Sequence, residues 1–183
     1  MGPRERYREQ VRDEVKQHAW EQIATAGVSA LSLNAIAKQM GVSGPALYRY
    51  FANRDELITA LIRDAYQSLV DTVTATETDL LGLAGLIREW ALADPHRYLL
   101  IYGTPVPGYH APADTTAISD QVMQVVVASA GDPASAVQRG LLFWTRLHGV
   151  LSLELAGHFA GMDVDPAALV SQEIGALADR TGQ

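Results

Sequence analysis

The sequence of 183 residues predicts an all-α fold with about nine helices and no β-sheet. Apolar residues recur at steps of three and four along nearly every long segment, as they do on one face of an α-helix. Three Asp-Pro pairs, which suit the start of a helix, divide the second half of the chain. The alternation of apolar and polar residues that marks a half-buried strand is nearly absent.

The first two predicted helices both end at glycine. Apolar positions from Tyr7 to Ala26 follow the helical step, and Gly27 can adopt the conformation that stops a helix. Ser32 can cap a short second helix, which ends at Gly41.

The third and fourth helices are predicted from a proline and a capping pair. Pro45 is tolerated in a first helical turn, so a short helix is expected from Pro45 to Tyr50. Asn53 and Glu56 form a variant of the capping box, with Asn in place of the usual Ser or Thr. They open a long helix over about 54–76.

The remaining helices lie in a more apolar half of the chain. One is predicted over 79–93, and the Asp-Pro pairs predict helices from about residues 95, 133 and 166. The conspicuous loop runs from Gly103 to Asp114 and contains three prolines. These helices divide the chain into three segments, over residues 1–53, 54–78 and 79–183.

Charge is spread unevenly along the chain. The whole chain has a net charge of −7, which excludes a uniformly basic nucleic-acid coat. Residues 1–63 hold nine basic and seven acidic side chains, net +2, whereas residues 64–183 hold five and fourteen, net −9. This asymmetry predicts different partners for the two parts.

Composition also limits the chemistry and the location. The chain has no cysteine, which excludes disulfides, thiol nucleophiles and cysteine-ligated metal centres. No metal-ligand spacing, nucleophile elbow or phosphate-binding loop is found, so we expect no enzyme activity and no cofactor. The longest apolar stretch is interrupted by charged residues, and the charged N-terminus lacks a secretory signal. We therefore expect a cytoplasmic protein with no membrane partner.

Residues 31–57 carry the most information about function. Two short helices separated by Gly41, Val42 and Ser43 have the connection length of a helix-turn-helix unit. Such a unit inserts its second helix into the major groove of DNA. Basic and tyrosine side chains suited to phosphate contact surround this helix. The alternative is a purely structural helical bundle, which can contain the same two helices.

The run SLNAIAKQMGVSGPALYRYFANRDEL over residues 32–57 resembles the DNA-binding domain of the tetracycline-repressor (TetR) family. The matching pattern is specific and, with the preceding helix, covers about residues 7–65. The resemblance implies that DNA contacts are made by Ser32, Asn34, Ser43, Gly44, Pro45, Ala46, Tyr48, Arg49, Tyr50 and Arg54. Arg54 replaces the family's usual lysine and keeps its charge.

The predicted recognition helix offers few polar side chains to the bases. Arg49 can contact guanine through two hydrogen bonds, a contact that discriminates by ~1–3 kcal/mol. Contacts of Pro45 or Ala46 with thymine methyl groups, together with DNA shape, would supply the remaining specificity. The alternative for Arg49 is a solvated surface charge.

A homodimer is expected, because one helix-turn-helix unit makes too few contacts to recognise a site. The last two long helices are apolar on more than one face, and the resemblance implies that they form the dimer. The candidate interface residues are Ala136, Gly140, Leu147, Leu151, Leu155, Ile174, Leu177 and Ala178. The alternative is that these residues fill the core of the monomer.

Mixed aromatic and polar residues predict a pocket for a small-molecule effector. The candidates are Trp90, Tyr98, Tyr102, Met123, Trp144 and His148. The run from Trp144 to Gly149 also resembles the W-x-x-x-H-G signature of one TetR-like C-terminal subgroup. For each aromatic residue, a place in the core is the alternative.

Together these features predict a transcriptional regulator that binds an operator in double-stranded DNA and acts as a repressor that a small molecule releases from this operator. We expect a helix-turn-helix domain at 1–53, a connecting helix at 54–78 and a ligand-binding and dimerisation domain at 79–183. A second hypothesis is an all-helical small-molecule carrier or enzyme whose helix-turn-helix is vestigial. A helical adaptor for other proteins is a third, and it would expose a large apolar patch.

Overall fold

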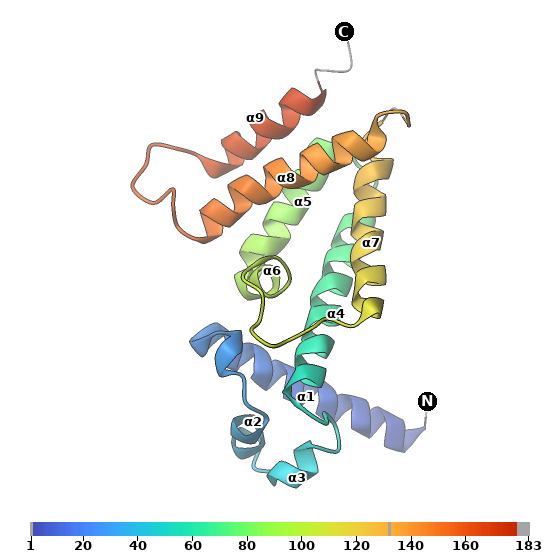
Figure 1. Cartoon of the computed structure of the whole chain (residues 1–183), viewed down its shortest axis with the longest axis vertical. Helices are drawn as coiled ribbons and strands as arrows, with labels where there is room; N and C mark the ends of the chain where they lie inside the picture. Colours follow the sequence, from blue (N-terminus) through green and yellow to red (C-terminus); the bar gives the residue numbers. More distant parts are fainter. Residues whose placement is uncertain (1, 132, 179–183) are drawn as a thin grey trace. The chain divides into compact units, whose positions relative to one another are not determined.

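The computed structural model describes residues 2–131 and 133–178, and its described part contains nine α-helices, one 3-10 helix and no strand (Figure 1). The predicted all-α class is therefore confirmed. In chain order the elements are α1 (Pro3–Ala26), η1 (Val28–Ala30), α2 (Leu33–Gln39), α3 (Gly44–Leu47), α4 (Arg54–Thr74), α5 (Leu80–Ala93), α6 (Pro95–Tyr102), α7 (Ala113–Ala128), α8 (Ala136–Leu155) and α9 (Pro166–Ala178).

Most helix ends follow local chemistry that is readable in the sequence. Gly27 adopts a φ of 76° and donates its N–H to the carbonyl of Ile23, which ends α1. Ser32 Oγ accepts the N–H of Ala35 at 3.3 Å, and Asp79 Oδ1 accepts that of Gly82 at 2.9 Å. These bonds satisfy amide groups that a first helical turn leaves without partners.

Three boundaries differ from the prediction by more than two residues. α1 begins at Pro3 rather than Tyr7, because the N–H of Gly2 bonds Glu5 Oε2 at 2.7 Å and no buried residue marks these exposed turns. α3 ends at Leu47, and the chain continues to Tyr50 as turns. α8 begins at Ala136 rather than 133, where the carbonyl of Ser135 accepts the N–H of Arg139 at 2.9 Å.

The chain forms two compact units. The first contains the described residues through Ala65 together with His96–Thr115, and the second contains Tyr66–Pro95 and the described residues from Thr116. α4 therefore contributes to both units, and α6 belongs with the helix-turn-helix segment.

The first unit is built around buried residues of α1, α2, α3 and α4. Val15 and Ala19 of α1 are fully buried, as are Ile36 of α2 and Phe51. Lys16 Nζ lies 2.7 Å from Asp64 Oδ2, so an ion pair joins α1 to α4. Burial of these apolar faces supplies the main stabilisation.

The segment after α6 is attached to α4 within the same unit. Tyr109 Oη lies 2.9 Å from the hydroxyl of Thr59, which is itself buried. Arg63 also forms an ion pair with Asp114. The loop that the sequence predicts between α6 and α7 is thus held at two points.

The second unit packs α8 against α9 and α5. Phe143 and Leu147 of α8 and Ile87 of α5 are fully buried. Arg88 Nε donates to Glu154 Oε2 at 2.9 Å, and this hydrogen bond raises the pKa of Arg88. Among the described residues, no helix is both long and apolar enough to cross a membrane.

Candidate nucleic-acid interface

The α2–turn–α3 segment begins from a capped helix and a glycine turn. α2 follows its cap residue Ser32, and Gly41 adopts a φ of 68° just after the helix ends. A residue with a side chain is strained in this conformation, so glycine suits the turn. Buried Ile36 and Leu47 hold the two short helices together on their inner side.

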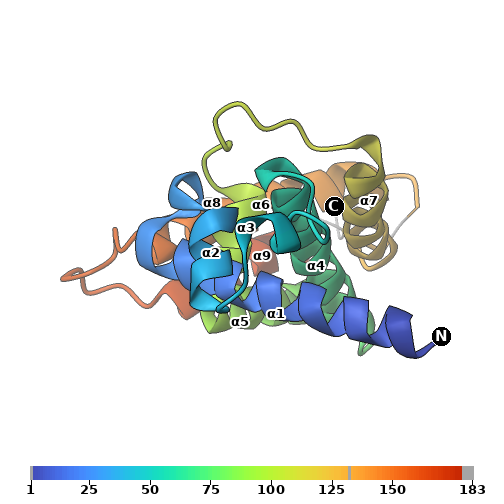
Figure 2. The ribbon, with the colours of Figure 1, turned by 90° about the horizontal axis from the view of Figure 1, so that it is seen from below.

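The outer side of α3 is accessible to solvent. Ser43, Pro45, Tyr48 and Arg49 are exposed, and Tyr48 keeps 43% of its surface accessible. Figure 2 views this side of the first unit, with α3 toward the viewer. A short helix with one buried anchor and exposed flanking side chains can enter a DNA groove.

Four other candidate residues of this segment are half-buried. Gly44, Ala46 and Tyr50 are partly covered, and so is Ser32. Asn34 of α2 is exposed and lies beside the start of α3. A Cβ added to Gly44 would be only 3.2 Å from Asn34 Oδ1. Glycine at this position therefore permits the first turns of α2 and α3 to approach.

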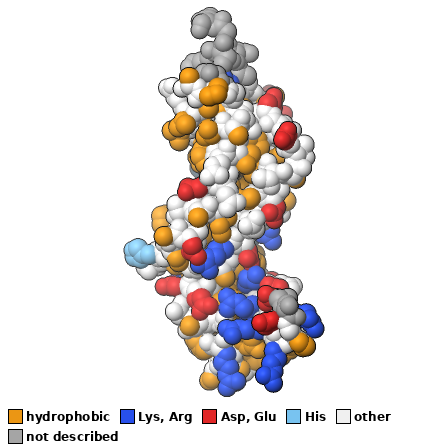
Figure 3. Space-filling model, turned by 90° about the vertical axis from the view of Figure 1, so that its right-hand side faces the viewer, with side chains coloured by type: hydrophobic (Ala, Val, Ile, Leu, Met, Phe, Trp, Pro, Cys, Tyr) orange, Lys and Arg blue, Asp and Glu red, His pale blue; other side chains and the backbone are white. Residues whose placement is uncertain are grey.

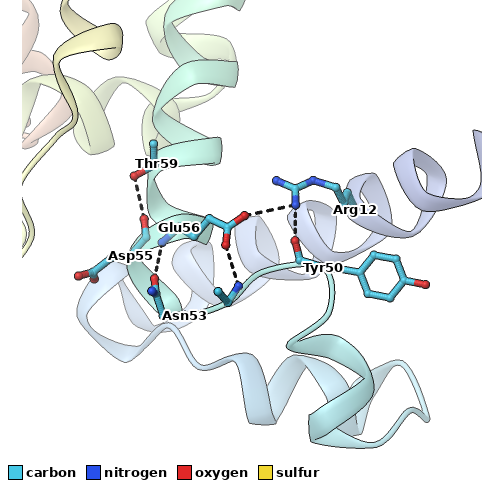
Figure 4. Close-up of polar contacts among 7 residues, drawn as sticks. Arg12, Tyr50, Asn53, Asp55, Glu56 and Thr59 are labelled. Carbon is cyan, nitrogen blue, oxygen red and sulfur yellow. Dashed lines mark hydrogen bonds and ion pairs between the residues drawn. The ribbon is translucent and has the colours of Figure 1, made fainter. Parts of the chain in front are cut away.

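Arg12 fastens the junction between α3 and α4 (Figure 4). Its guanidinium donates to the carbonyl of Tyr50, lies 3.4 Å from Glu56 Oε1 and stands 4.0 Å from the centre of the Phe51 ring. Glu56 Oε2 in turn accepts the N–H of Ala52 at 2.7 Å. We call Arg12, Tyr50, Phe51 and Glu56 the junction cluster.

The capping pair predicted from the sequence forms with one shift. Asn53 Oδ1 accepts the N–H of Glu56 at 2.8 Å, as expected for a helix cap. The Glu56 side chain, however, bonds the amide of Ala52 rather than that of the cap residue. The sequence does not predict the role of Arg12, because its partner Tyr50 lies 38 positions further along the chain.

Arg54 has a structural contact that the sequence does not indicate. Its Nη2 donates to the carbonyl of Val28 at 2.9 Å, which ties the start of α4 to η1. The side chain retains 31% exposure. A phosphate contact by Arg54 would therefore use a guanidinium already oriented by the protein.

Basic side chains gather on the first unit around these elements, as Figure 3 shows on one face. Arg4 and Arg8 of α1 are exposed, as are Lys38 of α2 and Arg49. Positive charge of this kind supports contact with a phosphate backbone.

The predicted effector residues fall in both units. Tyr98, which is buried, and Tyr102 lie on α6 of the first unit with ring centres 5.4 Å apart. Trp90, Met123, Trp144 and His148 belong to the second unit. Trp90 is buried and donates its indole N–H to Ser68 Oγ at 3.1 Å.

Trp144 and His148 share one face of α8, as their spacing predicts. Their ring centres are 4.3 Å apart in an edge-on arrangement. Burial lowers the pKa of His148 to about 4, so its imidazole is neutral at pH 7.

A hollow of about 410 Å³ lies within the second unit. Its described lining comes from the end of α4, the α4–α5 turn, α5 and the end of α7, and includes Val73, Thr74, Glu77, Thr78, Leu83 and Ser129. The six predicted pocket residues are not among the described lining residues. We call this space the α4–α7 hollow.

Most of the predicted interface side chains are buried within the single chain. Ala136, Gly140, Leu147, Leu151, Ile174 and Leu177 are buried, and Leu155 is half-buried. Ala178 is the last residue of α9, and its side chain lies outside the described part. Burial of the described members within the single chain is what the core alternative predicts.

Another face of α8 is apolar and exposed. Val137, Leu141 and Leu153 are 63%, 53% and 45% exposed. The exposed residues of α8 carry no charge: Val137, Gln138, Leu141, Leu142, Thr145, Gly149, Ser152 and Leu153. We call this set the α8 stripe. The two apolar faces of α8 indicate such a stripe, but the sequence does not say which face is inside.

Comparison with known proteins assigns the family. Residues 17–61 match the model described as bacterial regulatory proteins, tetR family, and residues 80–177 match the tetracyclin repressor-like C-terminal domain. The HTH-type transcriptional regulator Rv1816 of Mycobacterium tuberculosis is 32% identical, over 92% of this chain and 91% of that protein.

Solved structures agree with this assignment. The regulatory protein SCO4313 is 56% identical and superposes with a TM-score of 0.92, over 97% of this chain and all of that one. A TetR variant from Acinetobacter baumannii, solved with minocycline, shares the fold at 19% identity and a TM-score of 0.60, over 92% of this chain and 96% of that one. The chain belongs to the tetracycline-repressor family of bacterial regulatory proteins.

Proposed function

We propose that this chain is a DNA-binding transcriptional repressor that a small molecule releases from its operator. The exposed outer side of α3, held in place by the junction cluster in the unit that carries exposed Arg4, Arg8, Lys38 and Arg49, is the observation that carries the proposal. Family membership supports a role in transcription regulation.

Base and phosphate contacts are divided among the predicted interface residues. Arg49 would contact a guanine edge, and Pro45 with Ala46 would contact thymine methyl groups. Ser32, Tyr48, Tyr50 and Arg54 would bind phosphates, while Asn34, Ser43 and Gly44 line the approach to the groove. Four of these residues, Ser43, Pro45, Tyr48 and Arg49, are exposed on or beside α3.

The homodimer would form through the α8 stripe rather than through the buried residues of α8 and α9. An exposed helix face without charge is typical of the centre of a protein interface. The described exposed residues of α9, which include Ser171, Gln172 and Ala176, are also uncharged.

The effector would bind the second unit and change the spacing of the two recognition helices. α4 would transmit the change as the connecting helix over 54–78, because it contributes residues to both units. Coupling requires that the ligand bind one spacing more tightly than the other. We assign Trp144 and His148, whose run resembles the W-x-x-x-H-G signature of one TetR-like subgroup, to this response.

A gel-shift titration with the DNA upstream of the protein's own coding region tests the proposal. The wild-type chain should shift this DNA, and the affinity should fall steeply as salt rises. Arg49→Ala should weaken binding by about tenfold, since it removes a guanine contact worth ~1–3 kcal/mol. Tyr48→Phe should have an effect of about the same size, since it removes a hydrogen bond to a charged phosphate worth ~1.5–3 kcal/mol.

The matched control is Glu89→Gln, which changes an exposed charge on α5 and should leave the shift unchanged. A folded dimer that binds no candidate operator at any salt concentration would contradict the proposal. Ligand binding that is independent of salt, in the same protein, would instead favour a carrier or an enzyme with a vestigial helix-turn-helix.

A further inference from the structure

The α4–α7 hollow has an apolar floor and a polar rim. Val73 and Leu83, which are buried, and half-buried Val125 line it with hydrocarbon. Thr74, Thr78 and Ser129 add hydroxyl groups, and Glu77 adds a carboxylate. A volume of about 410 Å³ is within the range of small-molecule sites.

The electrostatics of the hollow favour a positive ligand. The last turns of α4 and α7 both border it, and the C-terminal end of a helix carries partial negative charge. The first turn of α5 borders it as well, but the Asp79 carboxylate, which accepts the N–H of Gly82, offsets the partial positive charge of that end. Neither helix has a basic residue in its last turn. No Lys, Arg or His is among the described lining residues, so Glu77 supplies the formal charge.

The structure also places a hydroxyl group at the rim by close packing. The side chain of Thr78 occupies the space beside Gly82 of α5, where an added Cβ would lie 1.9 Å from Thr78 Oγ1. Any larger residue at position 82 would displace this side chain. Figure 1 shows the ends of α4 and α7 and the start of α5 at the same end of the second unit.

We infer that the α4–α7 hollow binds small organic cations that have an apolar body, such as primary amines with an aromatic or alkyl group. The ammonium group would lie near Glu77 and the helix ends and donate hydrogen bonds to hydroxyl or carbonyl oxygens. The apolar body would cover Val73, Leu83 and Val125. That such a cation acts as the effector rests on the proposed function.

Three probes with nearly the same apolar body test the site: phenethylamine, phenethyl alcohol and hydrocinnamate. Binding is followed by NMR titration of the full-length chain without DNA, reading the amide signals of Thr78 and Ser129. The amine should bind about tenfold more tightly than the alcohol, because only the amine gains an exposed ion pair with Glu77 and attraction to the C-terminal ends of α4 and α7. The carboxylate should have the lowest affinity of the three.

Two variants locate the binding. Glu77→Gln should weaken the amine about fivefold and leave the alcohol unchanged, while the control Glu89→Gln should alter neither. Ala128→Phe fills the hollow from an exposed position at the end of α7 and should abolish amine binding. Ala117→Phe makes the same change at an exposed position elsewhere on α7 and should have no effect.

Equal affinity for the amine and the alcohol would overturn the inference, as would unchanged amine binding in Glu77→Gln. Circular dichroism of each variant shows whether its helices are retained. Failure of the gel shift would contradict the proposed function alone, because the probe titration contains no DNA.

Discussion

Arg12 is the residue on which the position of α3 depends most directly. It joins α1 to the turn after α3 through the Tyr50 carbonyl and reaches Glu56 at the start of α4. Its guanidinium also lies over the Phe51 ring, whose side chain is fully buried. One side chain thus contacts all three segments of the junction.

Arg12→Gln should lower the free energy of unfolding by about 2 kcal/mol, since it removes a charged hydrogen bond to a partly buried junction. The ion pair with Glu56 contributes little to this value, because both groups are partly exposed. Urea unfolding followed by circular dichroism measures the change. Arg8→Gln, one turn earlier and exposed, should alter the free energy by less than about 0.5 kcal/mol, and equal effects would contradict the assigned role.

His148 makes the stability of the second unit depend on pH. Its pKa in the folded state is lowered to about 4 from 6.5, so the unfolded chain takes up a proton that the folded chain does not. The free energy of unfolding should therefore be highest above pH 6.5 and fall as the pH drops toward 4, by about 3 kcal/mol from this group.

Urea unfolding at pH 7 and at lower pH measures this dependence. His148→Gln should remove the His148 contribution, while His158→Gln, at an exposed position, should keep it. An identical pH dependence of the free energy of unfolding in wild type and His148→Gln would contradict the assignment of this dependence to burial of His148.

At the scale of elements, glycines decide how closely helices approach. A Cβ on Gly140 of α8 would lie 3.2 Å from Val127 Cγ2 of α7, whereas Gly85 of α5 has open space around it. Both glycines are helical, but only the first is enclosed by a neighbouring helix.

The same substitution at these two sites should therefore have opposite effects. Gly140→Leu should lower the free energy of unfolding by about 1–3 kcal/mol through overpacking, and Gly85→Leu should raise it by roughly 0.5 kcal/mol through helix propensity. Thermal unfolding of the two variants compares them, and a stable Gly140→Leu would mean that α7 and α8 can separate without cost.

At the scale of the whole molecule, the α8 stripe should control assembly. Leu141→Glu and Leu153→Glu place a charge where a dimer would exclude water, so sedimentation should show monomers instead of dimers. Both leucines are exposed in the single chain, so its fold should remain. Leu81→Glu, at a residue of α5 that is 46% exposed, should stay dimeric. Dimers in all three variants would exclude the stripe as the interface.

Sequence alone determined the helical class, most helix ends and the position of the helix-turn-helix. These features follow from local chemistry: Ser32 and Asn53 cap helices, Gly27 and Gly41 end them, and apolar residues repeat at helical steps. Tertiary structure decided the rest. It assigned Leu147 and Leu151 to the core and Leu141 to the surface, and it brought Arg12 to Tyr50. A helix that is apolar on two faces has no local signal for which face is inside, because only packing against distant segments makes that choice.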